Sequence, residues 1–427
     1  MLGSARRVVG VDAARGIALL GMMTVHVQPA VVDGRVTPAY LVASGRAAAL
    51  FAVLAGVGLA LATGGVRPRT GEGLRAARRG VMARAAVIVA VGLLLGELES
   101  GVAVILVHYG LLFVLVLPFL GWGPGRLAVA AAAVAVVVPA LGHVVRPLLP
   151  DRTYGSPSLS SLETPLQLLT ELTLTGYYPT LAWTAYVLAG LAVGRLPLRR
   201  AGTAVRVVVA GLVLAVGARV VSGLLLGPLG GRVGIEQATG AADLLGRNLD
   251  IALRTSMYGS TPTTTWWWLA VVTPHSTTTL DLVHTAGVAL AVLGVCMLVL
   301  PRPRWFAAPL VAAGSMTLSL YTLHVVLLST LLPRDLPYAL LWHVVVALGV
   351  GLVWRTFVGR GPLEAVAARA SAFAARGWGA AGPAGSAPLR WPEEAVGGPE
   401  ESVGDRPGPE GPEDPRPHAG PSPPPRR

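Results

Sequence analysis

The chain has 427 residues, of which 53% are hydrophobic and only 13% are charged. About a quarter of the residues in soluble domains are charged, so this composition excludes an ordinary soluble protein and indicates one that crosses a lipid bilayer several times. The formal net charge of +12 comes mostly from arginines between apolar runs, which membrane topology explains, so nucleic acid is not an expected partner. The one cysteine, Cys296, excludes an internal disulfide.

Ten apolar runs of roughly the length that a bilayer requires follow one another along the chain. They fall near residues 10–32, 44–64, 81–97, 102–121, 127–148, 177–194, 203–227, 280–300, 307–332 and 336–358. An eleventh stretch, TTTWWWLAVVT at 263–273, is too short to span, and its tryptophans favour an interfacial or re-entrant segment. We therefore expect an all-α, polytopic membrane bundle of about ten transmembrane helices over residues 1–366.

The arginines between these runs predict the orientation of the chain. The first run continues too long for a signal peptide and ends without a clear cleavage site, so we expect it to be retained. If ten spans are counted, most interhelical arginines fall on one side, which the positive-inside rule assigns to the cytoplasm. Both termini are then cytoplasmic, in a protein of the cell membrane. The arginines counted are Arg6, Arg7 and those at 67–84, 195–200 and 302–304.

The composition changes near residue 380, where proline, glycine and acidic residues replace the apolar runs. Such a segment has too little apolar material to form a packed core. We predict that residues 367–427 form a disordered cytoplasmic tail, separate from the transmembrane domain.

The first apolar run holds three ionisable residues, Asp12, Arg15 and His26, in the stretch VDAARGIALLGMMTVH. Such residues are costly in a bilayer and suggest function. Asp12 and Arg15 can pair on one helix face, and His26 returns to that face about 16 Å further along the axis. The stripe predicts a cation suited to phosphate at one end and a titratable imidazole at the other. Alternatively, Asp12 and Arg15 are ordinary interfacial residues and His26 is an interhelical hydrogen-bond donor.

Further polar residues lie in or beside other apolar runs. Tyr321 and His324 are three apart and share a helix face. His275, Asp281 and His284 have spacings that match no zinc motif, so no metal is expected. His143 and His343 have no patterned neighbours and are interpreted as structural. The remaining members of this polar set are Arg46 at the start of the second run, and His108 and Tyr109 in the fourth.

Several segments together resemble the YeiB-like bacterial membrane proteins, over roughly residues 8–366. The segments are DAARGIALLGMMTVH, GRAAALFAVLAG, HYGLLFVLVLP, YYPTLAWTAYVLAGLAVGR, GSMTLSLYTLH and GPLE. These proteins are related to the heparan-α-glucosaminide N-acetyltransferase-like group of the transmembrane acyltransferase superfamily. The pattern of Arg15, ten residues and His26 is also similar to the first helix of the acyltransferase-3 proteins, in which that histidine is taken as catalytic.

The resemblance implies an enzyme that takes an acyl group, acetyl first of all, from cytoplasmic acyl-coenzyme A. The acceptor is a hydroxyl or amino group, such as that of a sugar or a lipid-linked molecule, at the other face. Three departures from the family patterns stand out. The loop after the first span lacks the histidine of the heparan-type enzymes, and Ser315 and His324 stand where YeiB-like proteins often have a basic residue and a glutamine.

These observations favour a membrane acyltransferase in which His26 is the general base or carries the acyl group briefly. The donor would be held by Arg15, oriented by Asp12, and by Arg46, which matches an arginine usual in the YeiB-like proteins. Tyr321 and His324 would assist catalysis, and the acceptor would meet His108, His275, Asp281 and His284. Two alternatives remain: a transporter or flippase that uses the polar stripe as its pathway, and a non-catalytic scaffold that acts through its tail.

Overall fold

The computed structural model describes residues 8–98, 100–153, 155–239, 249–302 and 304–376. In these ranges the regular secondary structure is helical apart from one antiparallel hairpin, β1 (Val31–Val32) with β2 (Arg35–Val36). A helix lies in each of the ten predicted apolar runs, which confirms an all-α, polytopic membrane protein. The helices of the first five runs are α1 (Val9–Val27), α2 (Pro38–Ala43) with α3 (Arg46–Ala62), α4 (Gly71–Gly96), α5 (Leu106–Leu115) with η1 (Leu117–Gly121), and α6 (Pro124–Val145) with η2 (Arg146–Leu148).

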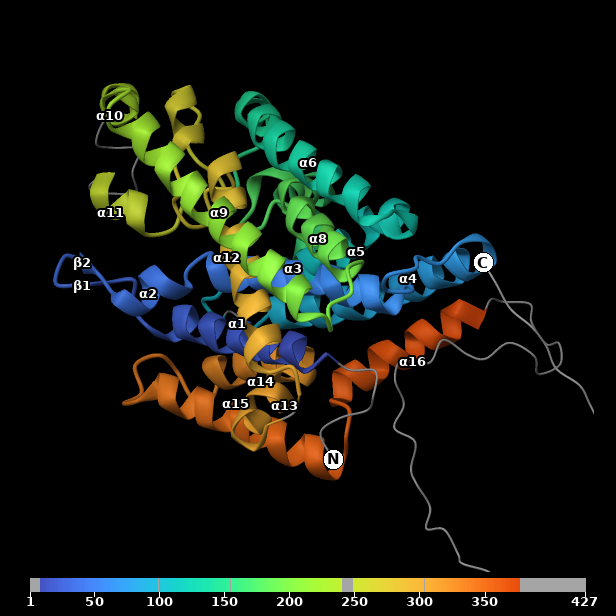
Figure 1. Ribbon diagram of the computed structural model, residues 1–427. Coiled ribbons are helices and arrows are strands. Elements are labelled where there is room, and N and C mark those ends of the chain that lie inside the picture. The colour runs from blue at the N-terminus through green and yellow to red at the C-terminus, as the bar shows by residue number, and fades with distance from the viewer. Residues whose placement is uncertain (1–7, 99, 154, 240–248, 303, 377–427) are drawn as a thin grey trace, which may run out of the picture. The chain divides into compact units, whose positions relative to one another are not determined.

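The second half of the chain adds the other five runs and several short elements (Figure 1). The long helices here are α8 (Thr180–Gly194), α9 (Ala201–Leu226), α12 (Thr279–Val299), α13 (Ala308–Ser315) with α14 (Thr317–Ser329), α15 (Ala339–Phe357) and α16 (Pro362–Arg376). The short ones are η3 (Ser160–Glu163), α7 (Pro165–Thr170), η4 (Glu171–Thr175), α10 (Gly231–Thr239), α11 (Leu249–Arg254), η6 (Trp266–Ala270) and η7 (Trp305–Ala307). The predicted interfacial segment at 263–273 contains only η6, which is too short to span.

Length and apolar composition qualify six of the described helices to cross a membrane, or up to seven if a bent pair counts as one. They are Pro38–Ala62, Gly71–Gly96, Pro124–Leu148, Ala201–Leu226, Thr279–Val299 and Ala339–Phe357, and the bent pair is Trp305–Ser315 with Thr317–Ser329. Helices α5 and α8 are apolar but shorter. Most of α1, including Asp12, is buried within the protein, so it does not need a lipid-facing apolar surface.

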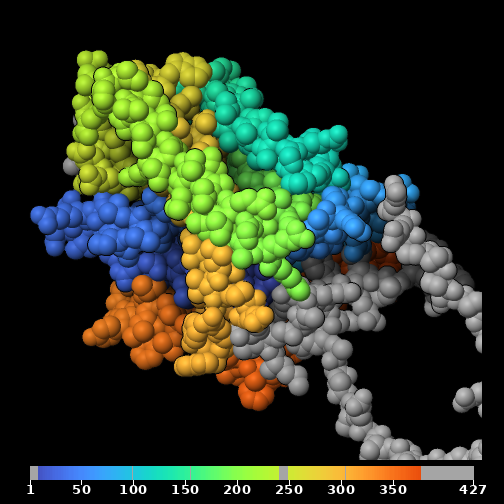
Figure 2. Space-filling view, in the orientation of Figure 1, coloured from blue at the N-terminus to red at the C-terminus, as the bar shows by residue number. Residues whose placement is uncertain are grey.

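The outward side of α9 fits a bilayer environment. This helix crosses the face of the molecule in Figure 2, and its exposed side chains are aliphatic apart from Arg206 and Arg219. Its inner side packs along α12, where Gly211 and Gly287 face each other so closely that an added Cβ on either would meet backbone atoms of the other helix. Small residues at such crossings let membrane helices approach without a large side chain between them. The aliphatic residues that are each more than half exposed include Val209, Leu212, Val213 and Val216.

The ninth predicted run is a broken helix rather than a straight one. α13 and α14 meet at an angle of 79°, with Met316 between them in a non-helical conformation. A break of this kind leaves backbone N–H groups of the second helix without helical partners. Glu364 of α16 satisfies two of them, because its Oε1 accepts hydrogen bonds from the N–H groups of Leu318 (2.7 Å) and Ser319 (3.2 Å).

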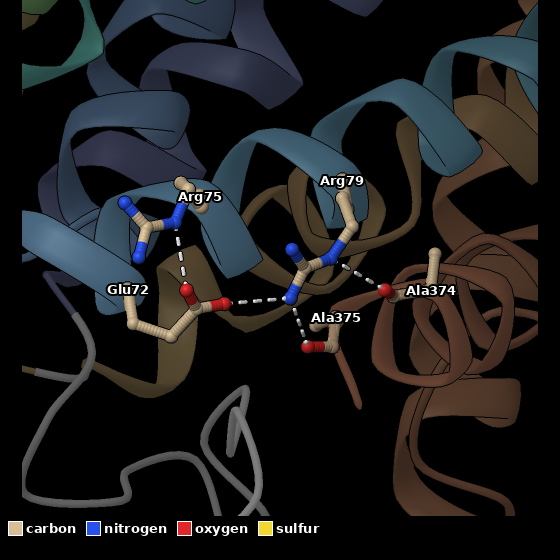
Figure 3. Close-up of polar contacts among 5 residues, drawn as sticks. All are labelled: Glu72, Arg75, Arg79, Ala374 and Ala375. Atoms are coloured by element: carbon tan, nitrogen blue, oxygen red, sulfur yellow. Dashed lines mark hydrogen bonds and ion pairs between the residues drawn. The ribbon is translucent and has the colours of Figure 1, made fainter. Parts of the chain in front are cut away.

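Helix α16 shows that the predicted boundary of the tail at residue 367 is wrong. Residues 367–376 are helical and pack on α4, with Ser371 against Gly80. Arg79 of α4 donates hydrogen bonds to the carbonyl groups of Ala374 and Ala375, the last turn of α16, and Glu72 bridges Arg79 to Arg75 (Figure 3). The helix was missed because it is rich in alanine and buries small side chains. Residues 377–427, the rest of the predicted tail, lie outside the described residues.

Candidate active site

The polar stripe of α1 forms as its spacing predicts at the Arg15 end. The Arg15 guanidinium donates to Asp12 Oδ1 at 3.1 Å, and the Asp12 side chain is 7% exposed. Eleven residues separate Arg15 from His26, which places the two about 16 Å apart along the helix axis. The helix therefore carries an ion pair near one end and an imidazole near the other.

The Arg15 end is a cluster of cations. Gly58 of α3 leaves room for the guanidinium, because a Cβ added there would lie 2.7 Å from Arg15 Nη2. Arg84 of α4 is half-buried and interacts electrostatically with Arg15, with Arg360 and with Glu364. Arg84 thus lies within electrostatic range of two other guanidinium groups from different parts of the chain, and of one carboxylate from α16. Such a group of cations is suited to a phosphorylated ligand.

The His26 end opens into a cavity of about 550 Å³. Four tyrosines line this cavity together with two histidines and Arg334. A volume of this size can hold a small organic molecule, and rings with polar tips can both stack on a ligand and hydrogen-bond to it. Its lining includes His26, Tyr177, Tyr178, Tyr258, His275 and Arg334.

His26 belongs to a chain of three histidines. Its Nδ1 lies 3.1 Å from Nε2 of His324 on α14, and the two rings are nearly parallel. His324 Nδ1 lies 3.0 Å from Nδ1 of His343 on α15, and His343 Nε2 lies 3.0 Å from the carbonyl oxygen of Leu332. The structure thus brings His324 to His26 and adds His343, which the sequence analysis interpreted as structural. Tyr321 lies beside them, with its ring centroid 6.4 Å from that of His26.

His275 is the second histidine of the cavity, and aromatic rings enclose it. Its ring lies nearly parallel to that of Trp183, and Tyr177 and Tyr178 meet it edge-on. The backbone is left-handed at His275 (φ 55°) and at Thr277 (φ 56°). This conformation is strained at Thr277, because threonine is β-branched. Burial lowers the pKa of His275 to about 4, so this imidazole is neutral at pH 7.

Arg46 does not join Arg15, although both were predicted to bind the same donor. It stands twelve residues before Gly58 on α3, so it lies about 18 Å from the Arg15 end along that helix. Its guanidinium donates to the Leu41 carbonyl at 2.6 Å and contacts His284 Nε2 at 3.2 Å. The His284 Nδ1–H in turn donates to the carbonyl of Ala215 at 2.9 Å. Arg46 therefore ties α3 to α12 and, through His284, to α9.

The other predicted acceptor residues are not among those that line the cavity. His108 meets Tyr178 edge-on, with ring centroids 5.4 Å apart. Asp281 is buried at the start of α12, where its Oδ2 accepts from the Thr277 N–H at 3.1 Å. Of the ten predicted site residues, His26 and His275 are the two that line the cavity. Within the described ranges no three His, Cys, Asp or Glu side chains are grouped to hold a metal ion.

Arg334 is a cavity residue that the sequence analysis missed. Its Nε donates to the carbonyl oxygen of His26 and its Nη2 to that of Gly101, both at 2.7 Å. It thus connects the last turn of α1 to the loop before α5, and a cation there also complements the negative end of the helix dipole. A lone arginine in LLPRDLP, on the side of the membrane predicted to be poor in arginine, was the available signal.

The apolar helices define a polytopic membrane protein, and two histidines line its cavity. Residues 7–224, just over half of the chain, match the family model described as heparan-alpha-glucosaminide N-acetyltransferase, catalytic. The chain belongs to this family. A search of the curated proteins gives no match. The family match includes Arg15 and His26 but ends before α12, α14 and α15, and the narrower YeiB-like assignment stays a prediction.

Proposed function

We propose that the protein is a membrane acyltransferase that moves an acyl group, acetyl first of all, from acyl-coenzyme A to a hydroxyl or amino acceptor such as a sugar. The observation that carries this proposal is the position of His26: it lines a cavity of about 550 Å³, and the same helix carries Arg15 in a cluster of cations. The family supports an acetyl-coenzyme A donor in general.

The donor would bind at the Arg15 end, which we assign to the cytoplasmic side. Arg15, Arg84 and Arg360 supply permanently charged guanidinium groups, and such groups bind phosphates through two parallel hydrogen bonds. Before the donor binds, the ion pair with Asp12 would hold Arg15 in place. The thioester end of the donor would then follow α1 toward His26. Arg46 and His284 would hold helices α3, α9 and α12 together and would not touch the donor phosphates.

The acceptor would bind in the cavity at the His26 end. His26 would take the proton from the acceptor hydroxyl or amine as that atom attacks the thioester carbonyl carbon. The new C–O or C–N bond forms, the C–S bond breaks, and the coenzyme A thiolate receives the proton from His26. The aromatic side chains Tyr177, Tyr178 and Tyr258 would stack on the acceptor, with His275 held neutral among them.

Substitutions at the two ends of the stripe should fail in different ways. Arg15→Ala should weaken acetyl-coenzyme A binding by roughly tenfold to a hundredfold, because it removes a charge-assisted hydrogen bond to phosphate. His26→Ala and His26→Gln should keep donor binding and lose about a hundredfold to ten-thousandfold in rate, because neither can carry the proton. Calorimetry with acetyl-coenzyme A measures binding, and release of the free thiol measures turnover.

The control is His143→Asn, on α6, where the ring packs on Trp266 away from the histidine chain. Each variant must elute as a single species in detergent, because a polar residue between membrane helices also contributes to packing. Full turnover by a folded His26→Ala protein would remove His26 from the mechanism. Unchanged donor binding by Arg15→Ala would move the donor site elsewhere.

A further inference from the structure

His343 on α15 is the third member of the histidine chain, and it is not among the residues that line the cavity. We infer that His343 is a positioning residue that sets the tautomer of His26 through His324. This inference rests on the proposed function, in which His26 is the base. It adds a residue that neither the sequence pattern nor the matched range 7–224 singled out.

The fixed point of the chain is the carbonyl of Leu332. A carbonyl oxygen only accepts hydrogen bonds, so the contact at 3.0 Å requires a proton on His343 Nε2. In a neutral imidazole the other nitrogen is then bare, so His343 Nδ1 is an acceptor. The backbone of the loop between α14 and α15 thus decides which nitrogen of His343 carries the proton.

The same rule passes along the chain to the cavity. His343 Nδ1 accepts at 3.0 Å, so His324 must carry its proton on Nδ1 and leave Nε2 bare. His324 Nε2 then accepts from His26 Nδ1–H at 3.1 Å. His26 is left with a bare Nε2, the nitrogen that can take a proton from an acceptor. The opposite set of tautomers would put the bare Nε2 of His343 against the Leu332 carbonyl, with two lone pairs facing each other.

A fixed tautomer matters to a general base because only a bare nitrogen can accept a proton. When His26 Nε2 receives the proton of the acceptor, its Nδ1–H still donates to His324, and that bond becomes charge-assisted and stronger. The positive charge therefore forms against a partner that is already in place. When the thiolate of coenzyme A leaves, the proton on Nε2 is returned to it and the chain resumes its neutral arrangement.

Two substitutions of His343 separate this role from simple packing. His343→Leu removes the acceptor, so His324 and His26 should each become a mixture of both tautomers. His343→Asn offers an amide oxygen one bond from Cγ, as Nδ1 is in histidine, so it can still accept from His324 Nδ1–H. The tautomers are measured directly from the nitrogen-15 spectrum of histidine-labelled protein, in which bare and protonated ring nitrogens resonate far apart. The signals of His26 are assigned by their loss in His26→Gln.

The expected result is a bare Nε2 on His26 in the wild type and in His343→Asn, and a mixture in His343→Leu. Turnover should fall about tenfold to a hundredfold in His343→Leu, the usual loss when a functional histidine loses the partner that orients its ring. In His343→Asn it should stay within a few-fold of the wild-type rate. Acetyl-coenzyme A binding should stay constant in both, and His143→Asn should change neither readout. The spectrum needs no activity, so a wild type without acyl transfer would end the proposed function and leave the tautomer result standing.

Two outcomes would overturn the inference. One is an unchanged His26 tautomer in His343→Leu, which would show that His343 does not set it. The other is a His343→Asn protein that keeps the tautomer but is as slow as His343→Leu. If His343→Leu fails to fold, the other two proteins still test the inference. A wild-type His26 that carries its proton on Nε2 would overturn it, and so would a His343→Asn protein with a mixed His26 tautomer or with turnover reduced tenfold or more.

Discussion

Arg195 lies just after α8 with 1% of its surface exposed, and its guanidinium is surrounded by acceptors. It donates to the carbonyl groups of Ala60 and Gly65 at the end of α3, and to that of Leu120 in η1. A cation at this position completes the hydrogen bonds of a helix C-terminus and opposes its negative end. Arg195 is therefore a structural clamp between α3, α8 and η1, although its position after an apolar run also fits the topology argument.

We predict that Arg195→Ala lowers the free energy of unfolding by about 3 kcal/mol or more, because several buried carbonyl groups lose their donor together. Arg195→Lys should restore only part of this, since an ammonium group has three donors and no planar fork. The matched control is Arg200→Ala at an exposed site nearby, with an expected change within about 0.5 kcal/mol. Thermal unfolding in detergent measures all three. Equal stability of Arg195→Ala and Arg200→Ala would contradict the clamp.

The predictability of the site depends on how far apart its residues lie in the chain. The Asp12–Arg15 pair follows from a spacing of three on one helix, so the sequence alone predicted it. The contact between His26 and His324 joins positions 298 apart, and no local pattern says that α14 approaches α1. Neither His343 nor Arg334 stands in a local motif. Their roles depend on tertiary packing, which also separated Arg46 from Arg15.

At the scale of elements, α16 joins two helices that the site uses. Its first turn caps α14 through Glu364, and its last turn accepts hydrogen bonds from Arg79 of α4. The break between α13 and α14 could not be predicted from the run 307–332, because Glu364, which caps the broken end, follows 46 residues after Leu318. The ten apolar runs themselves were predictable, since each depends only on local composition.

Truncations on either side of α16 should therefore behave differently. A chain ending at residue 376 keeps the helix and should elute like the full protein, whereas one ending at 366 loses most of α16 and uncovers Gly80 on α4. Size-exclusion chromatography of fluorescent fusions, before and after heating, measures the difference. We expect a lower transition temperature and more aggregate for the chain that ends at 366. Identical profiles for the two chains would show that the contacts of α16 do not stabilise the fold.

At the scale of the whole molecule, the proposed reaction requires one orientation. Acyl-coenzyme A is cytoplasmic, so the Arg15 end of α1 must face the cytoplasm and the His26 cavity must face the other side. The positive-inside rule predicts the same, because the arginines at 67–84 and 302–304 would lie on the Arg15 side. In both arguments the loop after α12 lies on the Arg15 side of the membrane and the loop before α8 lies on the other side. An odd number of spans must therefore separate these two loops.

Labelling of single cysteines tests that orientation, because the one native cysteine, Cys296, is buried. In a Cys296→Ser background, Leu162→Cys before α8 and Arg302→Cys after α12 both occupy exposed positions. A membrane-impermeant maleimide should label Leu162→Cys in intact cells and Arg302→Cys only after lysis. Labelling of both in intact cells would mean an even number of spans between them. The reverse pattern would place the Arg15 cluster outside the cell, away from acyl-coenzyme A, and would contradict the proposed function.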